Sequence, residues 1–227
     1  MKKIGMIVAI SKELESAIAK YGTAPKIVED SGYTTHIYEF PTYTLYILGS
    51  GAGEIYASSS TQYLITKYNV DIIINFGIVG GLTEEMATTK LCVVENVVHY
   101  DFDTSAVDNV EVGRYIDYPS VYLPTNKSLL ETAITVEPTL TKVICASADK
   151  FVADVDKKQS LHDIYKADIC DMESAGIVLT ANRNNIPCVL IKAVADSLFG
   201  GAIEYEDALT TAANKCIDIA HKIIENI

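Results

Sequence analysis

Three carboxylic acids stand where a strand-like segment gives way to a helix or a loop: Glu13, Glu173 and Asp196. Asp196 ends an apolar, partly β-branched run that begins at Cys188, a pattern typical of a strand buried on both faces of a parallel sheet. Ligands of open α/β sheets bind beyond the carboxyl ends of the strands. We therefore expect the three acids to converge at one edge of a sheet, where they could donate and accept protons.

Two of these acids also have a simpler interpretation. Asp196 could cap the element after it, because Ser197–Gly201 has the composition of a mobile loop with a glycine pair as its hinge. Glu13 falls in the first turn of a helix whose predicted N-cap is Ser11, and a carboxylate there interacts favourably with the helix dipole. At such an exposed helix start, Glu13 would contribute little to stability.

Two glycine-rich junctions accompany the acids, at residues 50–53 and 77–81. The first lies between a strand-like segment and a helix, as in dinucleotide-binding proteins. However, Tyr56 stands where the Gly-x-Gly-x-x-Gly pattern needs its third glycine, and no acidic residue ends a second strand about 20 residues later. The Gly-x-x-x-x-Gly-Lys-Ser/Thr pattern is missing as well. The sequence thus disfavours a nicotinamide cofactor, and we expect no cofactor.

Composition narrows the range of partners. The chain has 227 residues, of which 49 % are hydrophobic, and a formal net charge of −12. That charge disfavours nucleic acids and anionic membranes as partners, and no run reaches the roughly 20 apolar residues that span a bilayer. The five cysteines are widely spaced, without Cys-x-x-Cys, which is typical of a reduced, cytoplasmic protein. His99 lies near Asp101 and Asp103, but hydrogen bonding explains this group better than a metal site.

Strands that alternate with helices would position these residues. Apolar runs predict strands over residues 3–10, 27–40, 42–48, 71–76, 91–98, 142–147, 167–171 and 188–196. Helices are predicted over residues 11–19, 54–68, 128–134, 156–166, 172–185 and near the C-terminus. This order predicts one α/β domain over residues 1–227, with a mainly parallel sheet covered on both faces. Residues 101–126 are irregular and rich in aromatic side chains, as functional or interfacial segments often are.

Seven short motifs, taken together and in this order, make the chain resemble the nucleoside phosphorylase superfamily, and within it the methylthioadenosine/adenosylhomocysteine nucleosidases. The resemblance covers nearly the whole chain. Its motifs are residues 7–10 followed by Glu13, then 50–53, 71–77 with 80–82, 99–103, 147–151, 171–175 and 192–196. It implies a three-layer αβα sandwich around a mixed, mainly parallel sheet. It also implies hydrolysis of the N-glycosidic bond of 5′-thio-substituted adenosines, with release of adenine, in methionine salvage.

The resemblance further implies a role for individual residues. Asp196 matches the acid that protonates N7 of the purine, and Glu13 matches the acid that activates the attacking water. Met172 and Glu173 match the pair that packs on the ribose and binds its hydroxyls. The other positions expected to bind substrate are Ile10, Ala52, Ile78, Val79, Gly80, Thr104, Phe151, Val152, Lys192 and Tyr205.

Within that set, Phe151 matches the aromatic side chain that stacks on adenine, and Val152 matches a source of backbone hydrogen bonds to the base. Thr104 and Tyr205 match positions that line the pocket for the 5′-substituent. In the resembling family, the region corresponding to residues 101–126 of one subunit closes this pocket in the other subunit. We therefore expect a homodimer.

The residue types suit this chemistry. Cleavage of an N-glycosidic bond builds up positive charge on the ribose and negative charge on the departing purine, so an acid at the purine and a base behind the sugar both help. Glycosidases meet the same demand with two carboxyl groups. A pocket that encloses Asp196 should raise its pKa toward the working pH, whereas Glu13 must be ionised to accept a proton.

Two departures from the family pattern leave alternatives open. Ala195 and Ile78 stand where these nucleosidases usually carry hydroxyl-bearing residues. A phosphorylase, or a nucleosidase for another nucleoside such as a futalosine-type compound, is the first alternative. The second, from another class, is a nucleoside-binding protein without efficient catalysis.

Overall fold

The computed structural model describes all residues, 1–227, as ten strands and seven helices. The strands are β1 (Lys2–Val8), β2 (Lys26–Asp30), β3 (Tyr33–Glu39), β4 (Tyr43–Gly49), β5 (Ile72–Gly81), β6 (Leu91–His99), β7 (Leu123–Pro124), β8 (Thr141–Ser147), β9 (Ile169–Asp171) and β10 (Cys188–Asp196). The helices are α1 (Ser11–Tyr21), α2 (Glu54–Tyr68), α3 (Ser105–Asp108), α4 (Lys127–Val136), α5 (Val155–Tyr165), α6 (Ser174–Arg183) and α7 (Ala202–Glu225). No helix is both long and apolar enough to cross a membrane.

All ten strands belong to one mixed sheet, as predicted. β4, β1, β5 and β10 are parallel neighbours, and β6, β8 and β9 form a second parallel group. Antiparallel pairings of β10 with β6 and of β5 with β9 join the two groups, so this part of the sheet closes on itself. As a result, the carboxyl ends of β1, β5, β9 and β10 surround one opening.

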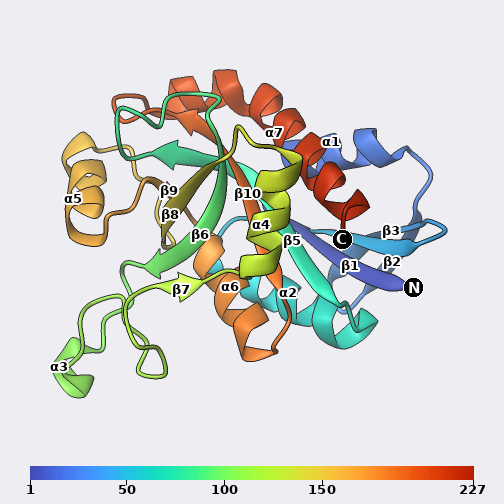
Figure 1. Cartoon of the computed structure of the whole chain (residues 1–227), viewed down its shortest axis with the longest axis horizontal. Helices are drawn as coiled ribbons and strands as arrows, with labels where there is room; N and C mark the ends of the chain where they lie inside the picture. Colours follow the sequence, from blue (N-terminus) through green and yellow to red (C-terminus); the bar gives the residue numbers. More distant parts are fainter.

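Helices cover both faces of the sheet, which confirms the predicted three-layer arrangement (Figure 1). α1, α4 and α7 pack on one face, in a core cluster that includes Phe76 and Ile191. α2 and α6 pack on the other face, in a second cluster that includes Leu64 and Ile177. α5 covers the end of β8 and β9 through Leu161 and a third, smaller cluster. β5 and β10 are buried along their whole length, as expected of parallel strands covered on both faces.

The second predicted glycine-rich junction is instead part of a strand. β5 continues through residues 77–81 rather than ending at Phe76. The glycines allow close approach: a Cβ on Gly81 would lie 2.3 Å from the carbonyl oxygen of Met86, and a Cβ on Gly77 would lie 2.9 Å from Oε1 of Glu13. Here glycine marks a strand that passes close to other groups, rather than a turn.

The single strand predicted over residues 27–40 is also wrong, because a tight turn divides it into β2 and β3. Ser31 and Gly32 both have positive φ angles, of 54° and 84°. Two successive residues in this conformation form the type of turn that best fits the twist of a two-residue hairpin. The remaining predicted elements differ from the observed ones mainly at their ends.

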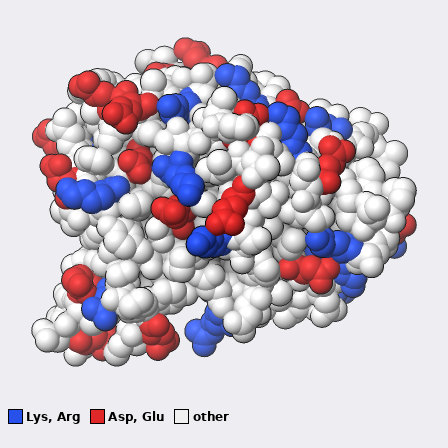
Figure 2. All heavy atoms as spheres, in the orientation of Figure 1, with Lys and Arg blue, Asp and Glu red and all other residues white.

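Within residues 101–126, the part around α3 forms a lobe that projects from the body of the molecule, and the end of the segment returns to the sheet as β7 (Figures 1 and 2). Its aromatic side chains partly cover one another: Phe102 stacks on Tyr115 with ring centroids 3.9 Å apart, and Tyr115 packs against Tyr118. Figure 2 shows acidic and basic side chains interspersed across this face of the molecule, without a continuous basic patch.

Candidate active site

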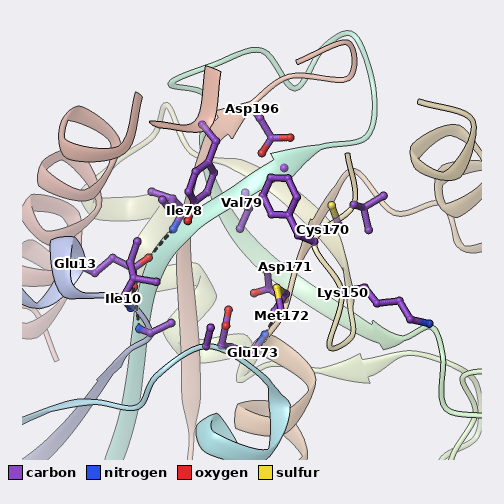
Figure 3. A pocket seen from close by; sticks show the side chains of 16 residues that line it. Ile10, Glu13, Ile78, Val79, Lys150, Cys170, Asp171, Met172, Glu173 and Asp196 are labelled. Carbon is purple, nitrogen blue, oxygen red and sulfur yellow. Dashed lines mark hydrogen bonds between the residues drawn. The ribbon is translucent and has the colours of Figure 1, made fainter. Parts of the chain in front are cut away.

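A cavity opens where β1, β5, β9 and β10 end (Figure 3). Twelve of the fourteen predicted site residues line it. They are Ile10, Glu13, Ala52, Ile78, Val79, Gly80, Phe151, Val152, Met172, Glu173, Asp196 and Tyr205. The three acids with which the sequence analysis began therefore lie around one space, although they are far apart in the chain.

Two predicted residues do not line this cavity. Lys192 lies behind its wall, where its ammonium donates a hydrogen bond to Oδ2 of Asp171 at 2.8 Å. Thr104 precedes α3 in the projecting lobe. Thr104 could contact substrate only through the cavity of another subunit or after a movement of the lobe.

Four lining residues were absent from the predicted set: Ala9, Lys150, Cys170 and Asp171. Each is a direct chain neighbour of a predicted residue or of another missed one. Asp171 stands inside one of the recognised motifs and at the end of a strand, which is the signal that could have identified it. Lys150 also stands inside a recognised motif but not at the end of a strand, and its ammonium lies 3.3 Å from Oδ2 of Asp101.

Glu13 is held almost entirely by backbone groups. Its Oε2 accepts hydrogen bonds from the N–H groups of Ala9 at 2.8 Å and Ile10 at 3.1 Å, and its Oε1 accepts one from Ile78 at 3.0 Å. An ionised carboxylate offers about four acceptor positions, two on each oxygen. One position therefore remains on Oε1, and a water molecule could occupy it.

The helix-dipole interpretation of Glu13 is incomplete. α1 is capped by Ile10 rather than Ser11, and the Glu13 side chain accepts from the N–H groups of Ile10 and of Ala9 before it. Glu13 is only 2 % exposed, so it does not lie at an exposed helix start and cannot be neutral for stability. Burial raises the pKa of Glu13, although the three N–H groups and the nearby Lys192 oppose this rise.

Asp196 ends β10 on another side of the cavity (Figure 3). The ammonium of Lys158, on α5, donates to its Oδ2 at 2.6 Å, which leaves Oδ1 free of this partner. Burial raises the pKa of Asp196, and Lys158 opposes the rise. A Cβ on Gly80 would lie 3.3 Å from both carboxyl oxygens, so glycine at this position leaves room beside the acid.

Glu173 lies at the floor of the cavity, before α6 (Figure 3). Its Oε1 accepts a hydrogen bond from the N–H of Gly53 at 2.9 Å. Burial, together with the charge of Asp171, raises the pKa of Glu173. Burial alone would also raise the pKa of Asp171, but Lys192 and two serine hydroxyls outweigh it and hold that pKa below its usual value.

A buried proton must lie on one of two acids next to Ser147, either Glu54 or Asp171. Oγ of Ser147 is 2.5 Å from Oε1 of Glu54 and 2.6 Å from Oδ1 of Asp171, yet a hydroxyl has only one proton to donate. Both contacts are hydrogen bonds only if one acid is protonated. Burial and the charge of Asp171 raise the pKa of Glu54 to about 8, so Glu54 carries that proton at neutral pH.

This proton makes stability depend on pH. Burial and Asp171 raise the pKa of Glu54 from its ordinary value of 4.5 to about 8 in the folded protein, so the folded state binds more protons between these values. The free energy of unfolding should therefore fall as the pH rises from 5 to 8.5. Glu54→Gln should make this fall shallower, because an amide donates to Ser147 and still accepts from the N–H of Gly176 without titrating.

The measurement is the melting temperature across that pH range for the wild type, Glu54→Gln and the control Glu15→Gln, which changes an exposed residue of α1. The control should keep the slope of the wild type. Equal slopes in all three proteins would place the proton elsewhere.

The cavity therefore combines a proton donor and a proton acceptor. Asp196, Glu13 and Glu173 face it from three different sides, with Glu173 at the floor (Figure 3). Near the mouth, Phe151 is 48 % exposed and its ring meets that of Tyr205 edge to face, with centroids 5.6 Å apart. Such an arrangement suits a ligand with a flat ring at one end and hydroxyl groups at the other.

Comparison with known proteins agrees with this geometry. The family model of the phosphorylase superfamily matches residues 3–225. The aminodeoxyfutalosine nucleosidase of Campylobacter jejuni is 23 % identical over the whole of both chains, and the 5′-methylthioadenosine/S-adenosylhomocysteine nucleosidase of Haemophilus ducreyi is 26 % identical over 99 % of this chain and 98 % of its own. A solved structure of a futalosine hydrolase mutant of Helicobacter pylori superposes over the whole of both chains with a TM-score of 0.95 at 20 % identity. The chain thus belongs to the phosphorylase superfamily.

Proposed function

We propose that this protein is a purine nucleosidase that hydrolyses the N-glycosidic bond of 5′-thio-substituted adenosines, such as methylthioadenosine and adenosylhomocysteine, and releases adenine. The observation that carries the proposal is the position of Glu13 and Asp196 on different sides of one cavity, with Glu173 at its floor. The name of the Haemophilus ducreyi relative supports the substrate class. Such a reaction would serve methionine salvage.

Each acid has a defined part in the reaction. Asp196, whose pKa burial raises, donates a proton through Oδ1 to N7 of adenine as the bond to the ribose breaks. Glu13 orients a water molecule at the remaining acceptor position of Oε1 and takes its proton as the water attacks C1′. Glu173 accepts hydrogen bonds from the ribose hydroxyls, and Met172 packs against the sugar.

The apolar end of the cavity binds the base. The exposed face of Phe151 stacks on adenine, and the backbone of Val152 forms hydrogen bonds with its edge. Tyr205, together with Ile10 and Ile78, surrounds the sugar and the start of the 5′-substituent. Ala52 leaves more room on this wall than a larger aliphatic side chain would.

A second substrate deserves the same assay. The relative from Campylobacter jejuni is named for aminodeoxyfutalosine, which supports a nucleoside with a larger 5′-group as the alternative. The chemistry at the glycosidic bond would be the same for both. Adenine release from methylthioadenosine, adenosylhomocysteine, aminodeoxyfutalosine and adenosine, compared by kcat/KM, distinguishes the two.

Asp196→Asn should lower kcat for adenine release by about 10²- to 10⁴-fold while KM changes little, because an amide cannot supply the proton. This change also leaves the buried ammonium of Lys158 without its counter-charge. The double variant Lys158→Met/Asp196→Asn is therefore compared with Lys158→Met, and circular dichroism verifies folding. Near-normal turnover by either Asn variant would exclude Asp196 as the acid.

Water rather than phosphate is the proposed nucleophile. A phosphorylase must hold a doubly charged anion next to the ribose, usually with arginine side chains that bind it through two hydrogen bonds. Neither arginine lines the cavity: Arg114 bonds to Glu111 in the projecting lobe, and Arg183 ends α6. Lys158 and Lys192 are already paired with Asp196 and Asp171, and Lys150, the lysine that lines the cavity, is paired with Asp101.

Turnover should accordingly be the same with and without about 10–50 mM phosphate in the assay. The sugar product should be a free thioribose. Sodium sulfate at matched ionic strength serves as the control for salt effects. Phosphate-dependent turnover with a ribose 1-phosphate product would assign the protein to the phosphorylase branch.

A homodimer is part of the proposal. Apolar side chains remain exposed on α2 (Ile55 and Tyr56) and in the projecting lobe (Val107 and Ile116). A hollow lined by both Ile55 and Tyr115 shows that these two regions adjoin. Burial of this apolar surface in a second subunit would stabilise the pair, and it would bring the lobe with Thr104 near another cavity.

Light scattering at micromolar concentration should give twice the chain mass of 24.7 kDa. Ile55→Asp should shift the protein toward the monomer, because burying a carboxylate in an apolar interface is unfavourable. Ile164→Asp, at another exposed apolar position, on α5, is the matched control and should leave the mass unchanged. A monomeric wild type would contradict the proposal.

We also assign the protein to the cytoplasm. All five cysteines are buried, and none forms a disulfide. This usage fits a reducing compartment.

A further inference from the structure

Lys158 is the most completely buried cation in the protein, and it does not line the cavity. It lies on α5 with a side chain that is 0 % exposed. Its ammonium donates to Oδ2 of Asp196 and to the carbonyl oxygen of Ser197, each at 2.6 Å. α5 is otherwise a polar helix that packs through Leu161 and Tyr165, so Lys158 is an exception among its buried side chains.

Stability alone does not account for this lysine. Moving an ammonium and a carboxylate out of water costs several kcal/mol for each ion, and apolar side chains of similar volume often serve as well or better. An interior ion pair at the edge of a catalytic cavity therefore points to a role in the position or charge of the acid.

Lys158 acts on both the position and the charge of Asp196. Its two hydrogen bonds link α5 to Asp196 and to the next residue, so the carboxyl group is held with Oδ2 toward α5 and Oδ1 away from Lys158. Its positive charge favours the ionised form of Asp196. A general acid must carry a proton before it can donate one, so the lysine opposes the protonated state that the reaction needs.

Burial and one neighbouring acid act in the opposite direction. Glu204 and Tyr205 approach it from α7, and Cys170 approaches it from β9. The charge of Glu204 favours protonation of Asp196, and so does burial. Glu204 also accepts hydrogen bonds from the N–H and the hydroxyl of Ser197, both at 2.9 Å, so it holds the segment after Asp196 from the other side. Lys158 is the one cation that counters these groups.

We propose that Lys158 is a positioning residue that orients Asp196 and sets the upper pH limit at which Asp196 can act as the acid. The role in catalysis rests on the function proposed above, whereas the control of protonation does not. With Lys158 in place, Asp196 loses its proton at a lower pH than its burial alone would allow, and adenine release stops at that pH.

The test compares Lys158→Met with the matched control Lys157→Met. Lys157 is the adjacent residue of α5, is exposed, and lies with its ammonium 5.2 Å from the centre of the Tyr100 ring. The titration of aspartate labelled with ¹³C at the side-chain carboxyl is followed by NMR from about pH 4 to 10. The Asp196 signal is the one that disappears in Asp196→Asn. The pH profile of kcat/KM is measured on the same proteins.

Lys158→Met should raise the titration midpoint of Asp196 by about one to three pH units, the usual effect of removing an opposite charge at this distance. The alkaline limb of kcat/KM should move up by the same amount. Lys157→Met should leave both at the wild-type values. Lys158→Arg keeps the charge and should also keep the wild-type midpoint.

A folded Lys158→Met protein with an unchanged midpoint would overturn the proposal and leave Lys158 as a structural residue. If Lys158→Met does not fold, Lys158→Gln, which is neutral but can still donate a hydrogen bond, takes its place. If neither neutral variant folds while Lys158→Arg does, the lysine is structural and the proposal fails. If the wild type releases adenine from no nucleoside, the proposed function fails, while the carboxyl titration still decides the role of Lys158.

Discussion

The burial of charge around one cavity is the constraint on which the rest of the structure depends. Every buried acidic or lysine side chain of the protein belongs to this region: the four acids Glu13, Glu54, Asp171 and Asp196, and the two lysines Lys158 and Lys192. The lysines neutralise only two of the acids. Because an isolated buried carboxylate is very unfavourable, the remaining two must be stabilised in other ways.

The fold stabilises these two acids in two ways, by backbone hydrogen bonds and by retention of a proton. Parallel pairing of β1 with β5 brings the end of β1 beside β5, so three backbone N–H groups can share the charge of Glu13. Glu54 instead retains a proton, which its short contact with Ser147 requires. Asp196 lies between these cases, since burial favours its proton and Lys158 favours its charge. The same constraint thus gives each acid a different protonation behaviour, which is what a reaction with one acid and one base needs.

The sequence predicted the strand ends better than the partners of the acids. Asp196 and Glu173 follow apolar runs, and a parallel sheet must bring such ends to one edge, so their convergence could be predicted. The burial of Lys158 could not be predicted, because a lysine in the middle of a polar helix has no pattern that marks it as buried. The predicted strand ended before the glycines of β5, because glycines in a row resemble a turn. In the structure these glycines are needed where Glu13 and Met86 approach the strand. The closing of the sheet depends on antiparallel pairs between distant strands, which periodicity cannot show.

The most direct test of this account is a high-resolution crystal structure with a bound, non-hydrolysable adenine nucleoside. The account predicts a water molecule that donates a hydrogen bond to Oε1 of Glu13, on the face of the ribose opposite the base. It also predicts Oδ1 of Asp196 within hydrogen-bond distance of N7, with Lys158 still bonded to Oδ2. A ribose hydroxyl bound directly to Glu13 with no water at that position, or an Asp196 turned away from the purine, would contradict it.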